Sequence, residues 1–215
     1  MKRNKVTSLY IHIPFCENIC DYCDFTKLQY FHNFAIKYIA SLKQEIASLN
    51  IDYKLKTIFV GGGTPTSLEE NLFLDLMTYL STFVDNNTEF SVECNPESLN
   101  KNKLEIMKKC GVNRISIGVE STNDKILKSI NRKHTFSDVK SAIELAREVG
   151  INNINLDLIL GLPNVTMSLL EKDIENIISL SPNHISCYGL TVHEHTVFHI
   201  NNIKPPKDDV LRQMY

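Results

Sequence analysis

The sequence is poor in cysteine and has no excess of either charge. Six cysteines among 215 residues are too few for a disulfide scaffold. With 23 basic against 25 acidic residues the net charge is −2, which argues against a protein that coats nucleic acid or binds membranes through a basic patch. No stretch approaches the roughly 18 consecutive apolar residues of a membrane span, and no low-complexity tract is present. Together with a hydrophobic content of 43%, these absences indicate an ordinary globular protein.

Short apolar runs alternate with longer amphipathic stretches along the chain. Strands are expected at 8–13, 57–60, 90–93, 114–118, 154–158 and 184–188. Helices are expected at 33–49, 101–109, 124–130, 137–149 and 167–179. A further helix is expected to open at a capping box of Ser67 and Glu70 and to run to about residue 84. This alternation predicts βαβ units and a mostly parallel sheet.

Polar and reactive residues gather at the ends of the expected strands. Cys16, the glycines at 61–63, Glu93, Glu120 and Asp157 each lie at or just after the carboxyl end of a strand. Parallel α/β folds bind their ligands at this edge of the sheet. The sequence therefore predicts a ligand site that is built from several strand ends.

Three of the cysteines form a C-x3-C-x2-C cluster at Cys16, Cys20 and Cys23. Thiolates on one short loop can bind three irons of a [4Fe–4S] cluster, which leaves the fourth iron open to a small molecule. A structural zinc ion is the alternative, but a closed zinc site takes four ligands, and neither a second C-x2-C pair nor a His pair is present. The spacing favours the iron–sulfur cluster. The other cysteines stand alone and are interpreted as small buried hydrophobic residues: Cys94, Cys110 and Cys187.

Four motifs follow one another in a fixed order along the chain. They are YIHIPFC at 10–16, which leads into the cysteine cluster, GGGTPT at 61–66, GVES at 118–121 and NLDLILGLP at 155–163. From about residue 8 to residue 191 the sequence resembles the radical S-adenosylmethionine (SAM) proteins related to oxygen-independent coproporphyrinogen III oxidase. The resemblance implies an α/β fold, an incomplete parallel (β/α)6 barrel, that holds a [4Fe–4S] cluster and SAM at the carboxyl ends of its strands.

This family divides at the second position after the third cysteine. Genuine coproporphyrinogen oxidases carry a further cysteine there, whereas this sequence has Phe25 and resembles the haem-chaperone (HemW-type) branch. That branch implies a protein that binds haem or a porphyrin, passes haem to acceptor proteins and depends on an electron donor. The alternatives are a coproporphyrinogen III dehydrogenase, which decarboxylates two propionate side chains with SAM, and a zinc-stabilised binding module.

The resemblance also assigns the site residues. The cluster ligands are Cys16, Cys20 and Cys23, and the residues assigned to SAM are Tyr10, Gly62, Gly63, Thr64, Glu93, Glu120, Arg132 and Asp157. Arg132 is expected to hold the carboxylate of the methionine part in a two-pronged pair. Glu120 departs from the glutamine usual in the family, which adds negative charge and removes an amide donor. Without the resemblance, the glycines are interpreted as a plain strand-to-helix turn and Tyr10 as part of the core. Glu93 and Asp157 are then helix-capping or turn acids, and Arg132 belongs to a solvated basic loop.

The two ends of the chain carry further expectations. The basic start, with Lys2, Arg3 and Lys5, resembles a signal peptide. The apolar stretch behind it is too short and is interrupted by a histidine and a proline, so we expect a cytoplasmic protein. Residues 1–200 are expected to form the radical SAM core. Residues 201–215 are expected to be a linker followed by the start of a truncated C-terminal region.

Overall fold

The centre of the molecule is a sheet of six parallel strands. The computed structural model describes residues 5–215, so Lys2 and Arg3 of the basic start lie outside the described residues. The strands pair in the order β1-β4-β5-β6-β7-β8, and within this range β1 and β8 are not paired with each other. The sheet is therefore open on one side. The strands are β1 (Ser8–Ile13), β4 (Thr57–Gly62), β5 (Glu89–Cys94), β6 (Arg114–Glu120), β7 (Asn153–Leu160) and β8 (His184–Gly189).

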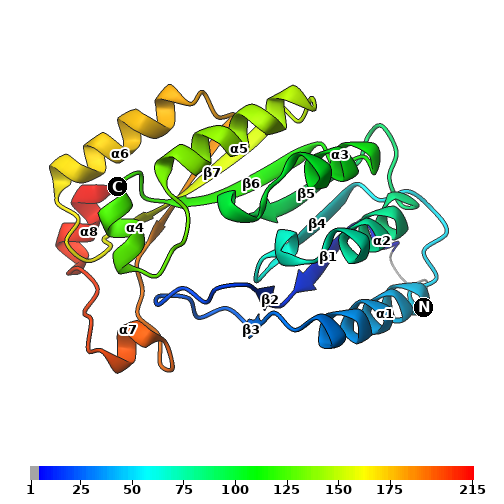
Figure 1. Ribbon diagram of the computed structural model, residues 1–215, viewed down its shortest axis with the longest axis horizontal. Coiled ribbons are helices and arrows are strands. Elements are labelled where there is room, and N and C mark those ends of the chain that lie inside the picture. Colours follow the sequence, from blue (N-terminus) through cyan, green and yellow to red (C-terminus); the bar gives the residue numbers. More distant parts are fainter. Residues whose placement is uncertain (1–4) are drawn as a thin grey trace.

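Helices cover the outer side of this sheet. In Figure 1, α1, α2, α3, α5 and α6 follow one another around it in the order of the strands. The helices are α1 (His32–Ser48), α2 (Glu70–Ser81), α3 (Lys101–Lys109), α4 (Asp124–Ser129), α5 (Phe136–Glu148), α6 (Met167–Ser179), α7 (Val197–Ile200) and α8 (Asp208–Met214). All six expected strands are present. The prediction of an α/β fold, an incomplete parallel (β/α)6 barrel, is confirmed.

Side-chain alternation decides which residues of a strand face the helices. In β1, Ile11 and Ile13 are buried in the core, whereas Tyr10 and His12 point to the opposite side. β6 and β7 are buried at almost every position, as expected for central strands of a parallel sheet. The polar residues of these two strands are therefore held in fixed surroundings.

The capping box predicted at Ser67 and Glu70 is wrong. Ser67 lies in a 3-10 turn, η1 (Pro65–Ser67), and its hydroxyl donates to the backbone oxygen of Phe15 at 3.0 Å. α2 begins after Glu69, whose side chain makes no capping hydrogen bond, and the helix ends at Ser81. The serine side chain thus holds the segment after the glycine motif against the strand that carries the first cysteine.

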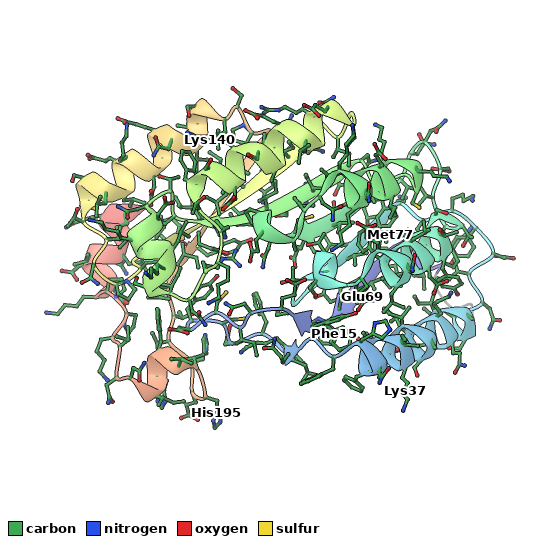
Figure 2. All side chains as sticks on the ribbon, in the orientation of Figure 1. Phe15, Lys37, Glu69, Met77, Lys140 and His195 are labelled. Atoms are coloured by element: carbon green, nitrogen blue, oxygen red, sulfur yellow. The ribbon has the colours of Figure 1, made fainter. Side chains whose placement is uncertain are left out.

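A second, two-stranded sheet carries this cysteine. β2 (Phe15–Cys16) pairs in parallel with β3 (Leu28–Gln29). Neither strand was predicted, because two residues show no periodicity. The Phe15 ring, labelled in Figure 2, is met nearly edge-on at centroid distances of 5.4–6.0 Å by Tyr30, Phe34 and Tyr38. These aromatic contacts anchor β2 to the start of α1.

The last helix lies against the edge of β8. Leu211 and Met214 of α8 pack against the core, and the Tyr215 hydroxyl accepts a hydrogen bond from the backbone N–H of Gly189 at 3.1 Å. Cys187 on this edge strand is exposed, so its predicted burial is wrong, whereas Cys94 and Cys110 are buried. The division of the chain at residue 200 stays a prediction. Among the helices of the described residues, none is both long and apolar enough to cross a membrane.

Candidate functional site

The cysteine loop is held by backbone hydrogen bonds at its start and in its middle. At its start, the backbone N–H of Tyr30 donates to the carbonyl of Cys16 at 2.9 Å. At its middle, Asp21 donates from its backbone N–H to the carbonyl of Ile130 at 3.2 Å and accepts from the N–H of Phe198 in α7 at 3.0 Å. The loop is therefore fixed to β3, to the segment after α4 and to α7, which are far apart in the sequence.

The glycine motif lies directly against the start of this loop. The N–H of Gly63 donates to the carbonyl of Ile13 at 2.8 Å. A Cβ atom at Gly63 would lie 2.8 Å from the backbone oxygen of Phe15 and 3.0 Å from the sulfur of Cys16. At Gly62, φ is +117°, and a Cβ there would meet the His12 ring at 2.6 Å. Gly63 is thus required for the close approach of the segment after β4 to the cysteine loop, and Gly62 for the close approach of β4 to the His12 ring.

Arg132 and Glu120 form a buried ion pair beside the second cysteine. Arg132 Nη2 donates to Glu120 Oε1 at 2.8 Å and to the carbonyl of Gly118 at 2.7 Å. Arg132 Nη1 donates to Cys20 Sγ at 3.7 Å and to Asn95 Oδ1 at 3.0 Å. Both terminal nitrogens of the guanidinium are therefore engaged by the protein. Its Nε is buried and has no hydrogen-bond partner among the described residues.

The backbone at Glu120 is strained. Its φ is +65°, in the left-handed region that is uncommon for a residue with a side chain, and the pairing of β6 with β7 shifts register between Gly118 and Glu120. Burial raises the pKa of the Glu120 carboxyl, and Arg132 acts against this rise. Strain combined with a buried charge is typical of a functional position.

Two further carboxylates face the same space. Glu93 Oε2 accepts a hydrogen bond from the backbone N–H of Gly62 at 3.0 Å, and burial raises the pKa of this carboxyl. Asp157 lies inside β7, three residues before the end of the strand. Its two oxygens accept from the hydroxyl of Ser116 and the amide of Asn155, both at 2.8 Å. Each carboxylate is therefore held in one orientation.

These residues line a single cavity of about 410 Å³, within the size range of small-molecule sites. Ten of the eleven predicted site residues border it: Cys16, Cys20, Cys23, Gly62, Gly63, Thr64, Glu93, Glu120, Arg132 and Asp157. Tyr10 does not border it. Tyr10 as a residue is 58% exposed, and its ring stacks on Phe59 while its hydroxyl forms a hydrogen bond with His12 Nδ1 at 3.0 Å. Its hydroxyl is connected to the site through the His12 ring, which lies against Gly62.

The prediction omitted several residues that border the cavity. Asn95 directly follows β5 and contacts both Thr64 and Arg132. Tyr22, which lies between the second and third cysteines in the sequence, is half-buried and borders the cavity, and Tyr188 borders it from β8. Asn95 could have been predicted from the signal that indicates Glu93, namely a polar residue at or just after the carboxyl end of a strand.

The donor set fits an iron–sulfur cluster better than a single metal ion. Within residues 5–215, no three His, Cys, Asp or Glu side chains converge on a point where they could hold one ion. A zinc site requires such convergence, whereas in a [4Fe–4S] cluster each thiolate binds a different iron. Burial raises the pKa of the thiols of Cys16, Cys20 and Cys23, and the Arg132 guanidinium opposes this rise. Metal binding would release the thiol protons.

Comparison with known proteins gives matches along most of the chain. A family model described as the Radical SAM superfamily matches residues 10–177. The chain is 45% identical to the heme chaperone HemW of Bacillus subtilis over 200 residues, which are 89% of this chain and 52% of that protein. It is 32% identical to the oxygen-independent coproporphyrinogen III oxidase of Pseudomonas aeruginosa over 191 residues, which are 85% of this chain and 42% of that protein.

A solved structure also resembles the fold closely. Coproporphyrinogen III oxidase (HemN) from Escherichia coli matches with a TM-score of 0.86 and 29% identity, over 98% of this chain and 50% of that chain. The chain spans about half the length of the curated relatives it matches.

Proposed function

The chain belongs to the radical SAM superfamily, and from this membership we propose that it forms the cluster- and SAM-binding part of a haem chaperone. The observation that carries the proposal is the shared cavity, into which the three thiols of one loop, the glycine motif and the Arg132–Glu120 pair all open. The identity to the Bacillus subtilis heme chaperone supports the haem-carrying role over that of an oxidase.

Cys16, Cys20 and Cys23 would hold the [4Fe–4S] cluster. Thr64 donates its hydroxyl proton to Cys16 Sγ at 3.6 Å, and Arg132 donates to Cys20 Sγ at 3.7 Å, so two of the three sulfurs already accept hydrogen bonds from the protein. Such bonds stabilise a thiolate. The chemistry that a bound and reduced cluster would supply there is the transfer of one electron to the sulfonium group of SAM.

The charges around the cavity suit a cationic ligand. Four carboxylates border it against two cationic side chains: Asp24, Glu93, Glu120 and Asp157 against Lys27 and Arg132. SAM carries a sulfonium and an ammonium group, both positive, and we propose that Glu93 and Asp157 face its ammonium and ribose groups. The two-pronged pair predicted for Arg132 requires that Glu120 or Asn95 releases a terminal nitrogen, because both of these nitrogens are occupied.

Phe25 separates the two candidate functions. Phe25 as a whole is 66% exposed and borders the cavity, at the position where the oxidases of this family carry a further cysteine. An apolar ring cannot supply the thiol of that cysteine, and it offers a surface on which a porphyrin face can pack. We therefore propose haem as the ligand. From the similarity to heme chaperones we also propose acceptor proteins and an electron donor as partners, and the cytoplasm as the location.

The test is a titration of the anaerobically reconstituted chain with haem, followed by visible absorption, and with SAM, followed by calorimetry. We expect saturable binding of both and no conversion of coproporphyrinogen III when SAM and a reductant are present. A variant without the three cluster cysteines is the control, and it should lose the SAM heat signal. Clear formation of protoporphyrinogen would establish the oxidase instead, and absence of saturable haem binding would contradict the proposal for this chain.

A further inference from the structure

We propose that Asn95 is a positioning residue that connects Arg132 to the sulfur of Cys16 through a directed chain of hydrogen bonds, and that this chain raises the reduction potential of the cluster. The proposal rests on the proposed function, because it assumes that the three cysteines hold an iron–sulfur cluster. Asn95 borders the cavity, but the hydrogen-bond partners of its side chain are Thr64, Glu97 and Arg132, and none of them is a cysteine. Its effect would pass through Thr64 and Arg132.

The chain of contacts is continuous. Arg132 Nη1 donates to Asn95 Oδ1 at 3.0 Å, Asn95 Nδ2 donates to Thr64 Oγ1 at 3.2 Å, and Thr64 Oγ1 donates to Cys16 Sγ at 3.6 Å. The same Arg132 nitrogen lies 3.7 Å from Cys20 Sγ. Asn95 therefore joins the surroundings of two thiols that are four positions apart on the loop.

The direction of each bond follows from the chemistry of the groups. A guanidinium can only donate, so the amide of Asn95 must present its oxygen to Arg132 and its nitrogen to Thr64. The Thr64 hydroxyl has a single proton. Because Thr64 accepts from Asn95, that proton is left for Cys16 Sγ. A chain in which every member donates in the same sense polarises its members and strengthens the last bond.

Local structure keeps Asn95 in this position. It follows β5 directly, and Pro96 begins the 3-10 turn η2 (Pro96–Ser98). The carbonyl of Asn95 accepts from both the N–H and the hydroxyl of Ser98, at 3.1 and 3.0 Å. Its second amide proton lies toward Glu97 Oε1 at 3.4 Å. All polar atoms of the side chain are thus used, and rotation of the amide would break three bonds.

A hydrogen bond to a cluster sulfur stabilises the more negative, reduced cluster and so raises its reduction potential. An aspartate at position 95 would still accept from Arg132 but could not donate to Thr64. The Thr64 proton would then turn to the carboxylate and leave Cys16 Sγ. Asn95→Asp is therefore the sharpest variant. It keeps the size of the side chain but removes the donor to Thr64, so the hydrogen bonds no longer run in one direction from Arg132 to Cys16.

The experiment is a redox titration of the anaerobically reconstituted chain, followed by electron paramagnetic resonance. We expect Asn95→Asp to lower the ratio of reduced to oxidised cluster at a fixed potential about tenfold, which is about 59 mV for a one-electron couple. Asn176→Asp is the matched control, because Asn176 also donates its amide to a threonine, Thr122 at 2.7 Å, away from the cysteines. Its potential should equal that of the parent chain.

Thr64→Val removes the last donor of the same chain and should give a shift of similar size. If the hydrogen bonds from Arg132 through Asn95 and Thr64 to Cys16 act as one unit, the double variant Thr64→Val/Asn95→Asp should shift the potential no further than either single variant. Unchanged potentials in both single variants, or additive shifts in the double variant, would overturn the proposal. Urea denaturation of the metal-free proteins separates a loss of folding from a loss of positioning. A parent chain that holds no cluster would overturn the proposed function instead.

Discussion

Replacement of Arg132 by methionine is expected to lower the free energy of unfolding by about 3–5 kcal/mol. The substitution removes the guanidinium that pairs with Glu120 at 2.8 Å and leaves this carboxylate buried without a cation. It also leaves the carbonyl of Gly118 and the amide oxygen of Asn95 without their donor. Breaking one half of a buried ion pair costs much more than removing an exposed charge, because solvent cannot compensate the charge that stays behind. Urea denaturation of the metal-free chain measures this loss.

Two further variants show whether the unpaired carboxylate causes the loss. The double variant Arg132→Met/Glu120→Gln should recover a large part of the lost stability, because no buried charge then remains unpaired. Arg212→Met, on an exposed position of α8, should change the free energy of unfolding by less than about 0.5 kcal/mol. If Arg132→Met behaves like Arg212→Met, or if the added Glu120→Gln recovers nothing, the buried pair does not stabilise the fold.

Loss of the three clustered cysteines is expected to abolish iron and sulfide binding. In the triple variant Cys16→Ala/Cys20→Ala/Cys23→Ala, every protein ligand that the loop offers to the cluster is gone. The variant should still fold, because two of these thiols are only partly buried and the loop is held by backbone hydrogen bonds. Analysis of iron, acid-labile sulfide and zinc per chain after anaerobic reconstitution measures the effect.

The matched control replaces the three solitary cysteines, Cys94, Cys110 and Cys187, with alanine. None of them belongs to the loop, and Cys94 and Cys110 are packed in the core. This control should keep about four irons and about four sulfides per folded chain. Retention of iron in the loop variant, or its loss in the control, would show that a different set of thiols holds the metal. Zinc without sulfide in the parent chain would support the zinc-stabilised module.

The strands and the carboxylates of the site could be predicted because they follow from short-range patterns. Apolar runs mark β4 and β7, and both lie within three residues of their predicted bounds. Glu93 and Glu120 end up in one cavity because parallel strands present their carboxyl ends at the same edge. The sequence order of such residues is enough to bring them together once the sheet is known to be parallel.

Other features depend on contacts between distant segments, which no local pattern reveals. Ser67 resembles a helix cap, but its hydroxyl bonds the carbonyl of Phe15, 52 positions away. Tyr10 shares the face of the sheet that lines the site, yet His12 lies between it and the glycine motif. Asn95 gains its place from two partners, Thr64 and Arg132, that are each more than 30 positions away.

Electron paramagnetic resonance of the reduced, reconstituted chain before and after addition of SAM shows whether the cluster has an open iron that SAM can reach. We propose that Cys16, Cys20 and Cys23 bind three irons of a cluster and leave the fourth iron facing the cavity beside Arg132 and Glu120. SAM is then expected to change the spectrum of the reduced cluster, because a ligand added at the open iron alters its electronic structure. A reduced [4Fe–4S] signal that stays the same at saturating SAM would show that SAM does not bind at an open iron of this cluster.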